Sequence, residues 1–182
     1  MMKLVPLSLA LTFAAAVPAS AQTPPPPPPA EAKAQAMPYV MAAGRSDLYE
    51  INSSQIALQK SQDPAIRKYA DMLIKHHQKT TAATLAAAQK ANLSPAPPAL
   101  DPGATASITE LQNASAADFD RLYLAQQVPA HQAALDLHQS YGANGDQAAL
   151  RASAKKAVPI VRRHLADAER MQSGSHAAHS GM

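Results

Sequence analysis

Four side chains combine residue types and positions that suit a metal ion: Glu50, His76, His131 and His164. Imidazole and carboxylate ligands suit Zn, Cu, Fe or Ni. Each of the four lies on a different predicted helix, on or beside its apolar face, so all four turn toward a shared interior. We therefore expect a transition-metal site in that interior, with Zn, Cu or Fe as the bound ion.

The same four side chains also allow a purely structural interpretation. A single histidine on an apolar helix face is more often a hydrogen-bonded core residue than a metal ligand. Buried polar groups must be paired in either case, so pairing alone does not separate a metal site from a polar network. The sequence leaves both interpretations open.

Residue counting along the helices tests whether the candidates share a level. From the first hairpin, Glu50 lies about 18 Å and His76 about 21 Å along the bundle, at 1.5 Å per residue. From the second hairpin, near Asn144, His131 lies about 20 Å away and His164 about 30 Å. We therefore expect His164 to lie about two turns beyond the level of the other three, unless the helix prolines or a longer hairpin shift it.

Two further histidines adjoin these candidates. His77 follows His76 directly, and a helix turns by about 100° per residue, so the two imidazoles point to different sides and cannot easily share one ion. His138 lies two turns beyond His131 on the same helix face and is a further candidate. We expect His76 rather than His77 to face the site.

Patterns typical of enzymes are missing from the sequence. A di-iron oxidase needs Glu-x-x-His on two helices, and no glutamate here has a histidine three residues later. Neither a Gly-rich phosphate loop nor a Gly-x-Ser-x-Gly elbow occurs. The sequence therefore favours a protein that is not an enzyme and has no catalytic residues.

Hydrophobic periodicity predicts four long helices that would position these side chains. Their expected ranges are 38–60, 64–91, 116–141 and 147–171. Asp63 before Pro64 is typical of a helix start, and so is Ser115 with Asp118 three residues later. A short helical piece over residues 104–113 is also compatible with the pattern.

Residues 92–114 form the longest predicted connection, and their prolines and Gly103 exclude a continuous helix. About 23 extended residues can span roughly 75 Å. That exceeds the roughly 42 Å length of a helix of about 28 residues. A bundle with one long crossover needs such a connection. We therefore expect an all-α, ferritin-like four-helix bundle with a long connection between its second and third helices.

The N-terminus has the pattern of an export signal. Met-Met-Lys is followed by an apolar stretch, Leu4 to Val17, that is too short to span a bilayer comfortably. Ala19-Ser20-Ala21 is typical of a cleavage site for signal peptidase. We expect residues 1–21 to be a signal peptide cut after Ala21, and the mature protein to be periplasmic or secreted.

The remaining segments flank the bundle. Residues 22–36 include six consecutive prolines, which favour an extended polyproline helix. We interpret them as a Pro-rich linker, either a spacer or a ligand for a proline-binding module. The bundle domain should cover residues 37–172, and residues 173–182 should be a flexible tail in which His176 and His179 could capture a metal loosely.

Composition narrows the classes of partner. The chain has 182 residues, no Cys, no Trp and a formal net charge of +3. Without cysteines there is neither a disulfide framework nor a thiolate metal site. The positive charge is too small and too dispersed for a nucleic-acid partner, and no stretch after the signal peptide is apolar enough for a membrane span.

Several residues together resemble the exported bacterial "domain of unknown function 4142" family: Glu50, Tyr69-Ala70-Asp71-Met72 followed by His76, Phe119-Asp120-x-x-Tyr123, His131, and Pro159 five residues before His164. The resemblance extends from about Met37 to Met171. It implies a ferritin-like helical bundle and no settled activity, and members are often labelled putative outer-membrane proteins. Members usually carry Asp before the second-helix histidine, whereas this chain has Lys75, which would weaken a site that depends on that acid.

Two functional hypotheses follow. The first is a non-enzymatic protein of the cell envelope or stress response that binds a transition metal in the bundle interior. The second is an interaction or structural module of the periplasm with a purely structural polar core. Neither the protein partner nor the oligomeric state follows from the sequence.

Overall fold

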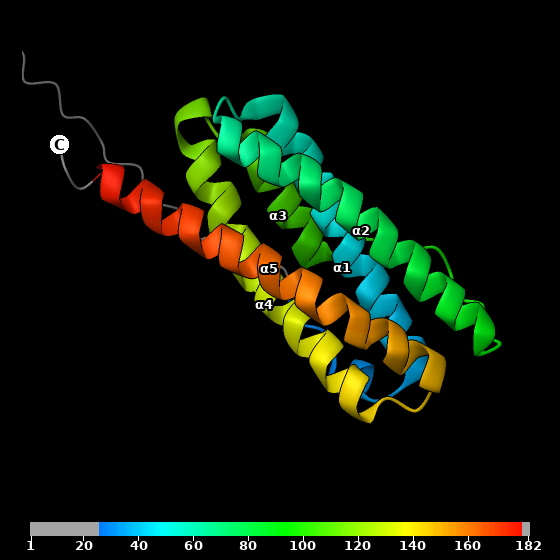
Figure 1. Ribbon diagram of the computed structural model, residues 1–182. Coiled ribbons are helices and arrows are strands. Elements are labelled where there is room, and N and C mark those ends of the chain that lie inside the picture. The colour runs from blue at the N-terminus through cyan, green and yellow to red at the C-terminus, as the bar shows by residue number, and fades with distance from the viewer. Residues whose placement is uncertain (1–25, 180–182) are drawn as a thin grey trace, which may run out of the picture.

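The computed structural model describes residues 26–179, and their side chains from 26 to 174. This part of the chain is all-α and contains the 3₁₀ turn η1 (Ala30–Lys33) and five α-helices (Figure 1). The helices are α1 (Ala36–Lys60), α2 (Pro64–Lys90), α3 (Pro102–Asn113), α4 (Ala116–Asn144) and α5 (Ala148–His179). No strand occurs among the described residues. The predicted signal peptide lies outside them.

Two helical hairpins, α1 with α2 and α4 with α5, pack against each other. Helix α1 also contacts α4, and α2 contacts α5, so the four long helices enclose one interior. Figure 1 shows that α2 and α4 run in the same direction. The chain must therefore return along the bundle between them, and residues 91–115, which include α3, make that return.

Local sequence signals define where the helices begin. Asp63 accepts hydrogen bonds from backbone N–H groups in the first turn of α2, as predicted. Ser115 accepts one from the N–H of Asp118 at the start of α4, also as predicted. Asp101 caps α3 in the same way, with Pro102 as its first residue. Because this cap and proline form a complete start signal, the expected short piece is a full helix of three turns.

Apolar side chains form a cluster at each end of the bundle. At one end Tyr39 of α1 stacks on Tyr141 of α4, with ring centroids 3.9 Å apart, among small alanines. At the other end Leu73 of α2 packs with Phe119 and Tyr123 of α4. A layer of buried polar side chains separates the two clusters, and the candidate site lies in this layer.

Residues 30–36 do not behave as the separate spacer that the proline content predicts. Ala32 is fully buried against the first apolar cluster. The Lys33 ammonium lies 2.6 Å from the Asp136 carboxylate on α4. The backbone N–H of Asp146 donates to the carbonyl of Ala34, at 3.0 Å. These contacts attach the segment to α4, to the loop after it and to the first apolar cluster.

The C-terminal end also differs from the expectation. Helix α5 continues to His179, whereas the hydrophobic pattern predicts a last helix that ends at Met171 and a flexible tail from residue 173. None of the helices between residues 26 and 179 combines the length and the apolar character needed to cross a membrane.

Candidate metal centre

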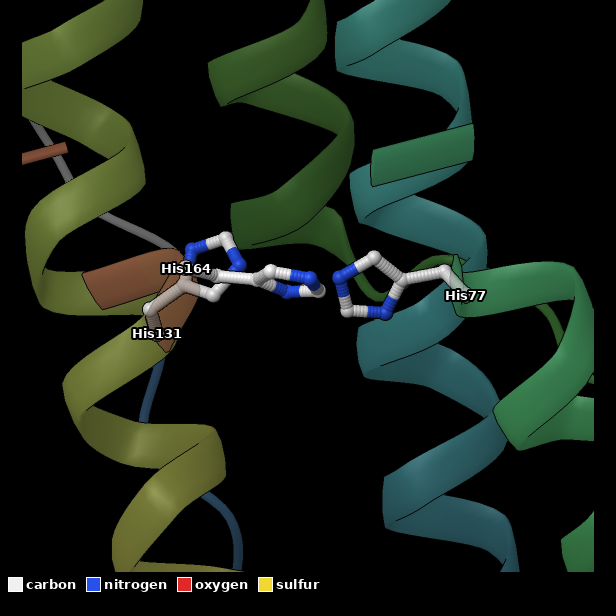
Figure 2. Close-up of side chains that lie close together, drawn as sticks. All are labelled: His77, His131 and His164. Atoms are coloured by element: carbon white, nitrogen blue, oxygen red, sulfur yellow. The ribbon is translucent and has the colours of Figure 1, made fainter. Parts of the chain in front are cut away.

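Three histidines from three helices converge in the polar layer of the bundle. His77 comes from α2, His131 from α4 and His164 from α5, and their rings point toward one another (Figure 2). One ring nitrogen of each lies within 4.8 Å of the others. All three side chains are buried, with at most 2% of any residue exposed.

Each of the three rings has an inner nitrogen, which faces the other imidazoles, and an outer nitrogen, which faces away from them. The outer nitrogen of His77 is hydrogen-bonded to a carboxylate. Its Nδ1 lies 2.7 Å from Oδ1 of Asp47 on α1. The hydroxyl groups of Thr80 and Thr81 donate to the same carboxylate. Since a carboxylate accepts, Nδ1 of His77 carries a proton. In the neutral ring Nε2 is then an acceptor, and it has no hydrogen-bond partner.

His131 repeats this arrangement, and for His164 the neighbour is a second imidazole, which can either donate or accept. Nδ1 of His131 donates to the backbone carbonyl of Gln127, at 3.0 Å, and its Nε2 has no partner. Nε2 of His164 lies 2.8 Å from Nδ1 of His76, and its own Nδ1 has no partner. Each ring therefore has one nitrogen held by a neighbour and one unpaired. A metal-binding histidine usually has this pattern, because the outer hydrogen bond selects the tautomer that exposes the ligand nitrogen.

Glu50 lies beside the cluster on α1. Its Oε1 is 3.7 Å from Nδ1 of His131, which is the outer nitrogen of that ring, and neither carboxylate oxygen has a hydrogen bond. Burial raises the pKa of Glu50 to about 7, although the charge of His77 lowers it. Glu50 is thus a buried carboxylate next to the imidazoles rather than one of the three converging groups.

Burial keeps two of the imidazoles neutral. It lowers the pKa of His131 to about 3, with a further contribution from the charge of His77. It lowers the pKa of His164 to about 2, and the other histidines add to the effect. For His77 burial acts in the same direction, but the hydrogen bond and charge of Asp47 outweigh it and raise the pKa. Neutral imidazole is the form that binds metal.

The geometry fits a metal ion after a small contraction. Ligand nitrogens about 2.0–2.1 Å from a tetrahedral ion are separated by about 3.4 Å. The three nitrogens here lie within 4.8 Å of one another, so shifts on the order of 1 Å would close the site. Three imidazoles leave a fourth position open for water or another ligand. Asp47 and Glu50 together could balance both charges of a divalent ion.

The structure brings together some of the predicted residues and separates others. His131 and His164 converge, and Glu50 lies next to His131. His76 is half-exposed and contacts His164 from outside, whereas His77 occupies the inner position. The expectation that His76 faces the interior is therefore wrong, while the assignment of a metal to these residues stays a prediction.

A sequence signal for His77 was present. The buried residues of α2 include Ile66, Ala70, Leu73, His77, Thr80, Thr84 and Ala87. These positions alternate by three and four residues, which is the period of a helix face that packs against its neighbours. His77 belongs to this series and His76 does not, so strict use of the period would have chosen His77.

The predicted level of His164 is also wrong. The rings of His131 and His164 are only 5.3 Å apart. The count of residues from Asn144 to His164 includes the hairpin loop as if the loop were part of the fourth helix, which makes His164 too distant. In the structure α4 ends at Asn144, 13 residues after His131, and α5 begins at Ala148, 16 residues before His164. The difference is three residues, less than one helical turn.

The further candidate His138 lies apart from the three converging nitrogens. Its Nδ1 is 3.0 Å from the hydroxyl of Tyr39, and the two rings meet edge to face. The last two predicted candidates, His176 and His179, lie on α5 beyond the residues whose side chains are described.

The fold is similar to several solved structures. CopM in the Cu(II)-bound form has a TM-score of 0.66 at 16% identity, over 77% of this chain and 97% of that chain. CopM in the Ag-bound form has a TM-score of 0.64 at 18% identity, over 77% and 96%. A DUF305 fragment from Deinococcus radiodurans has a TM-score of 0.66 at 15% identity, over 81% and 99%. At these identities the likeness shows a common fold.

Sequence comparison gives the family. No relative was found among the curated proteins. The model of "Domain of unknown function (DUF4142)" matches residues 21–171, which include α1 to α4 and most of α5. The resemblance carried by Glu50, His76, His131 and His164 and their neighbours is confirmed, and the protein belongs to the DUF4142 family.

Proposed function

We propose that this protein binds one transition-metal ion through His77, His131 and His164. The observation that carries the proposal is the pairing of the three rings: each outer nitrogen is held by a neighbour, and each inner nitrogen is unpaired. Asp47, the Gln127 carbonyl and His76 act as outer partners that orient the ligands.

A purely structural polar core explains this pairing less well. A buried polar atom without a hydrogen bond costs about 1–3 kcal/mol. The three inner nitrogens and both oxygens of Glu50 are all buried and unpaired in one layer. A bound cation would coordinate the nitrogens and attract the carboxylate, which removes this cost. A network that existed only for stability would be expected to pair these groups with one another.

Copper is the first ion to test. Imidazole ligands suit Cu, Zn and Fe, so the donor set alone does not choose between them. The CopM structures of similar fold were solved in Ag-bound, Cu(I)-bound and Cu(II)-bound forms. We therefore place copper before zinc and iron for this chain.

The scaffold that we propose is a ferritin-like four-helix bundle made of α1, α2, α4 and α5, with α3 in the crossover. Its support is the packing of each of these helices against two others and the common direction of α2 and α4. The predicted signal peptide supports export, so we propose that the ion is bound in the periplasm or outside the cell.

Titration of the mature protein tests the proposal. Protein purified without metal is titrated with Cu(II) or Zn(II) by calorimetry, and circular dichroism confirms that it is folded. The wild type should bind one ion. The variant His131→Gln should bind at least about 100-fold more weakly, because it loses one ligand. The matched control is His138→Gln, which alters a buried histidine of the same helix and should change the affinity little.

Two results would overturn this function. One is a folded, metal-free wild type that takes up no ion. The other is an equal loss of affinity in the two glutamine variants, which would indicate general damage to the core rather than loss of a ligand.

A further inference from the structure

A surface groove lies between α2 and α5, directly outside the buried histidines. Its volume is about 540 Å³, and its lining includes Tyr69, Met72, His76 and Met171. The last three of these side chains are partly exposed. The groove therefore contains partly exposed thioether and imidazole side chains beside the proposed centre: His76 contacts His164, Met72 lies five residues before His77, and Met171 lies seven residues after His164.

The positions of these side chains allow them to act together. Met72 and His76 are four residues apart on α2, so they are neighbours on one helix face. Met171 comes from α5, which packs against α2, and lines the same groove. Two thioethers and an imidazole form a soft ligand set, of the kind that favours Cu(I). Ag(I) is a soft monovalent ion of the same class.

His76 connects this groove to the buried cluster. Its Nδ1 lies 2.8 Å from Nε2 of His164, and the two rings are nearly parallel. Tyr69, in the groove lining, donates from its hydroxyl to the backbone carbonyl of His164, at 3.1 Å. His164 itself is fully buried. An ion in the groove would thus be one imidazole away from a ligand of the interior.

We propose that Met72, His76 and Met171 form a second, exposed site for a soft monovalent ion, Cu(I) or Ag(I), and that this site loads the buried cluster. The loading step rests on the proposed function, whereas the exposed site does not. Transfer is an exchange of ligands, from the thioethers and His76 to His164 and its partners. The oxidation state of the ion does not change, so this route delivers only a monovalent ion to the buried cluster.

The charged rim of the groove disfavours a divalent ion more than a monovalent one. Five cationic side chains and two acidic ones line it: Lys68, Lys75, Lys79, Arg163, Arg170, Asp71 and Asp167. Lys75 pairs with Asp71, and both arginines pair with Asp167. The surplus of positive charge repels a divalent ion twice as strongly as a monovalent one. Salt screens this repulsion at the surface, so it selects among ions without closing the groove.

Silver titration tests the exposed site. The mature protein is titrated with silver nitrate in nitrate buffer, and the double variant Met72→Leu/Met171→Leu is compared with wild type. Leucine conserves volume, so the fold should be kept. The matched control is Met37→Leu/Met41→Leu, which removes two thioethers from α1. We expect two ions per chain for wild type and control, and one for the groove variant. Two ions with unchanged affinities in the groove variant would overturn the site.

Stopped-flow mixing with silver nitrate measures the rate at which the buried cluster takes up the ion, and so tests the loading step. Uptake by the buried cluster should slow by about tenfold or more in the groove variant, while its final affinity stays the same, because only the path is altered. An unchanged rate would overturn the loading role.

A third variant, His131→Gln/His164→Gln, separates this inference from the proposed function. It should keep the groove ion and lose the buried one. If the wild type itself binds only an ion that depends on the methionines, the proposed function fails and the exposed site stands. If it binds only an ion that depends on His131, the exposed site fails.

Discussion

Helix α4 contains two buried histidines with different surroundings. His138 lies in contact with the apolar cluster at one end, where its Nδ1 meets the hydroxyl of Tyr39. His131 lies two turns earlier, in the polar layer, where its Nε2 faces other imidazoles and has no partner. The bundle can therefore supply a hydroxyl for a buried histidine, and does so for His138. The unpaired nitrogens around His131 then reflect a different role.

Acid should destabilise the surroundings of both His131 and His138, and it should produce the largest change in the free energy of unfolding. Burial lowers the pKa of His131 to about 3, of His138 to about 4 and of His164 to about 2. Below pH 6.5 the unfolded chain binds protons at these three positions and the native protein does not, so stability falls as pH falls. Glu50, with its pKa raised to about 7, opposes this with one proton between pH 7 and 4.5.

The raised pKa of His77 contributes stability that is fully present below pH 6.5 and is lost as the pH rises above it. The metal-free protein should then lose on the order of 2–3 kcal/mol per pH unit between pH 6.5 and 4.5, from a balance of about two protons. Urea unfolding at several pH values measures this. A free energy of unfolding that stays flat over the range would contradict neutral histidines at these sites.

Added metal should stabilise the variants of the two histidines to different extents. At a free ion concentration about 100-fold above the dissociation constant, the wild type should gain about 2.7 kcal/mol of stability. His138→Gln should gain as much, since it keeps all three ligands, and His131→Gln should gain little. Thermal unfolding with and without copper measures the gain. Equal gains in the two variants would remove the distinction between the two environments.

Replacing Asp47, the outer partner of His77, should lower the metal affinity less than replacing a ligand does. Asp47→Asn keeps the shape but removes the charge that orients and polarises His77. Loss of such a partner usually lowers metal affinity by about 10–100-fold. The control is Asp71→Asn, an exposed change on α2. Calorimetry that finds equal affinities for these two variants would count against an orienting role.

Replacement by leucine should change the stability of the metal-free protein in opposite directions at the two histidines. His138→Leu removes the hydrogen bond between the buried Tyr39 hydroxyl and His138 and should cost about 1–3 kcal/mol in the metal-free protein. His131→Leu removes an unpaired nitrogen and should be nearly neutral or stabilising. Urea unfolding of the two variants compares them. A larger loss for His131→Leu would favour the structural interpretation of the cluster.

Much of the fold followed from local patterns. Asp63 and Ser115 mark helix starts because their side chains satisfy backbone donors within the same few residues. The proline content of residues 92–114 indicated a long return without reference to any contact. Ala32 shows the limit of this reasoning, because its burial depends on a space between helices that no local pattern describes.

By itself the sequence determined the helices, their starts, the long return and the family, because these depend on residues close together in the chain or on a pattern of residue types. Only the tertiary structure decided which of His76 and His77 faces inward, and that His164 lies level with His131. Neighbouring helix positions differ by only about 100°, and the relative level of two helices depends on loop geometry and packing. The contacts between distant segments settle both, and with them the residues available to a metal.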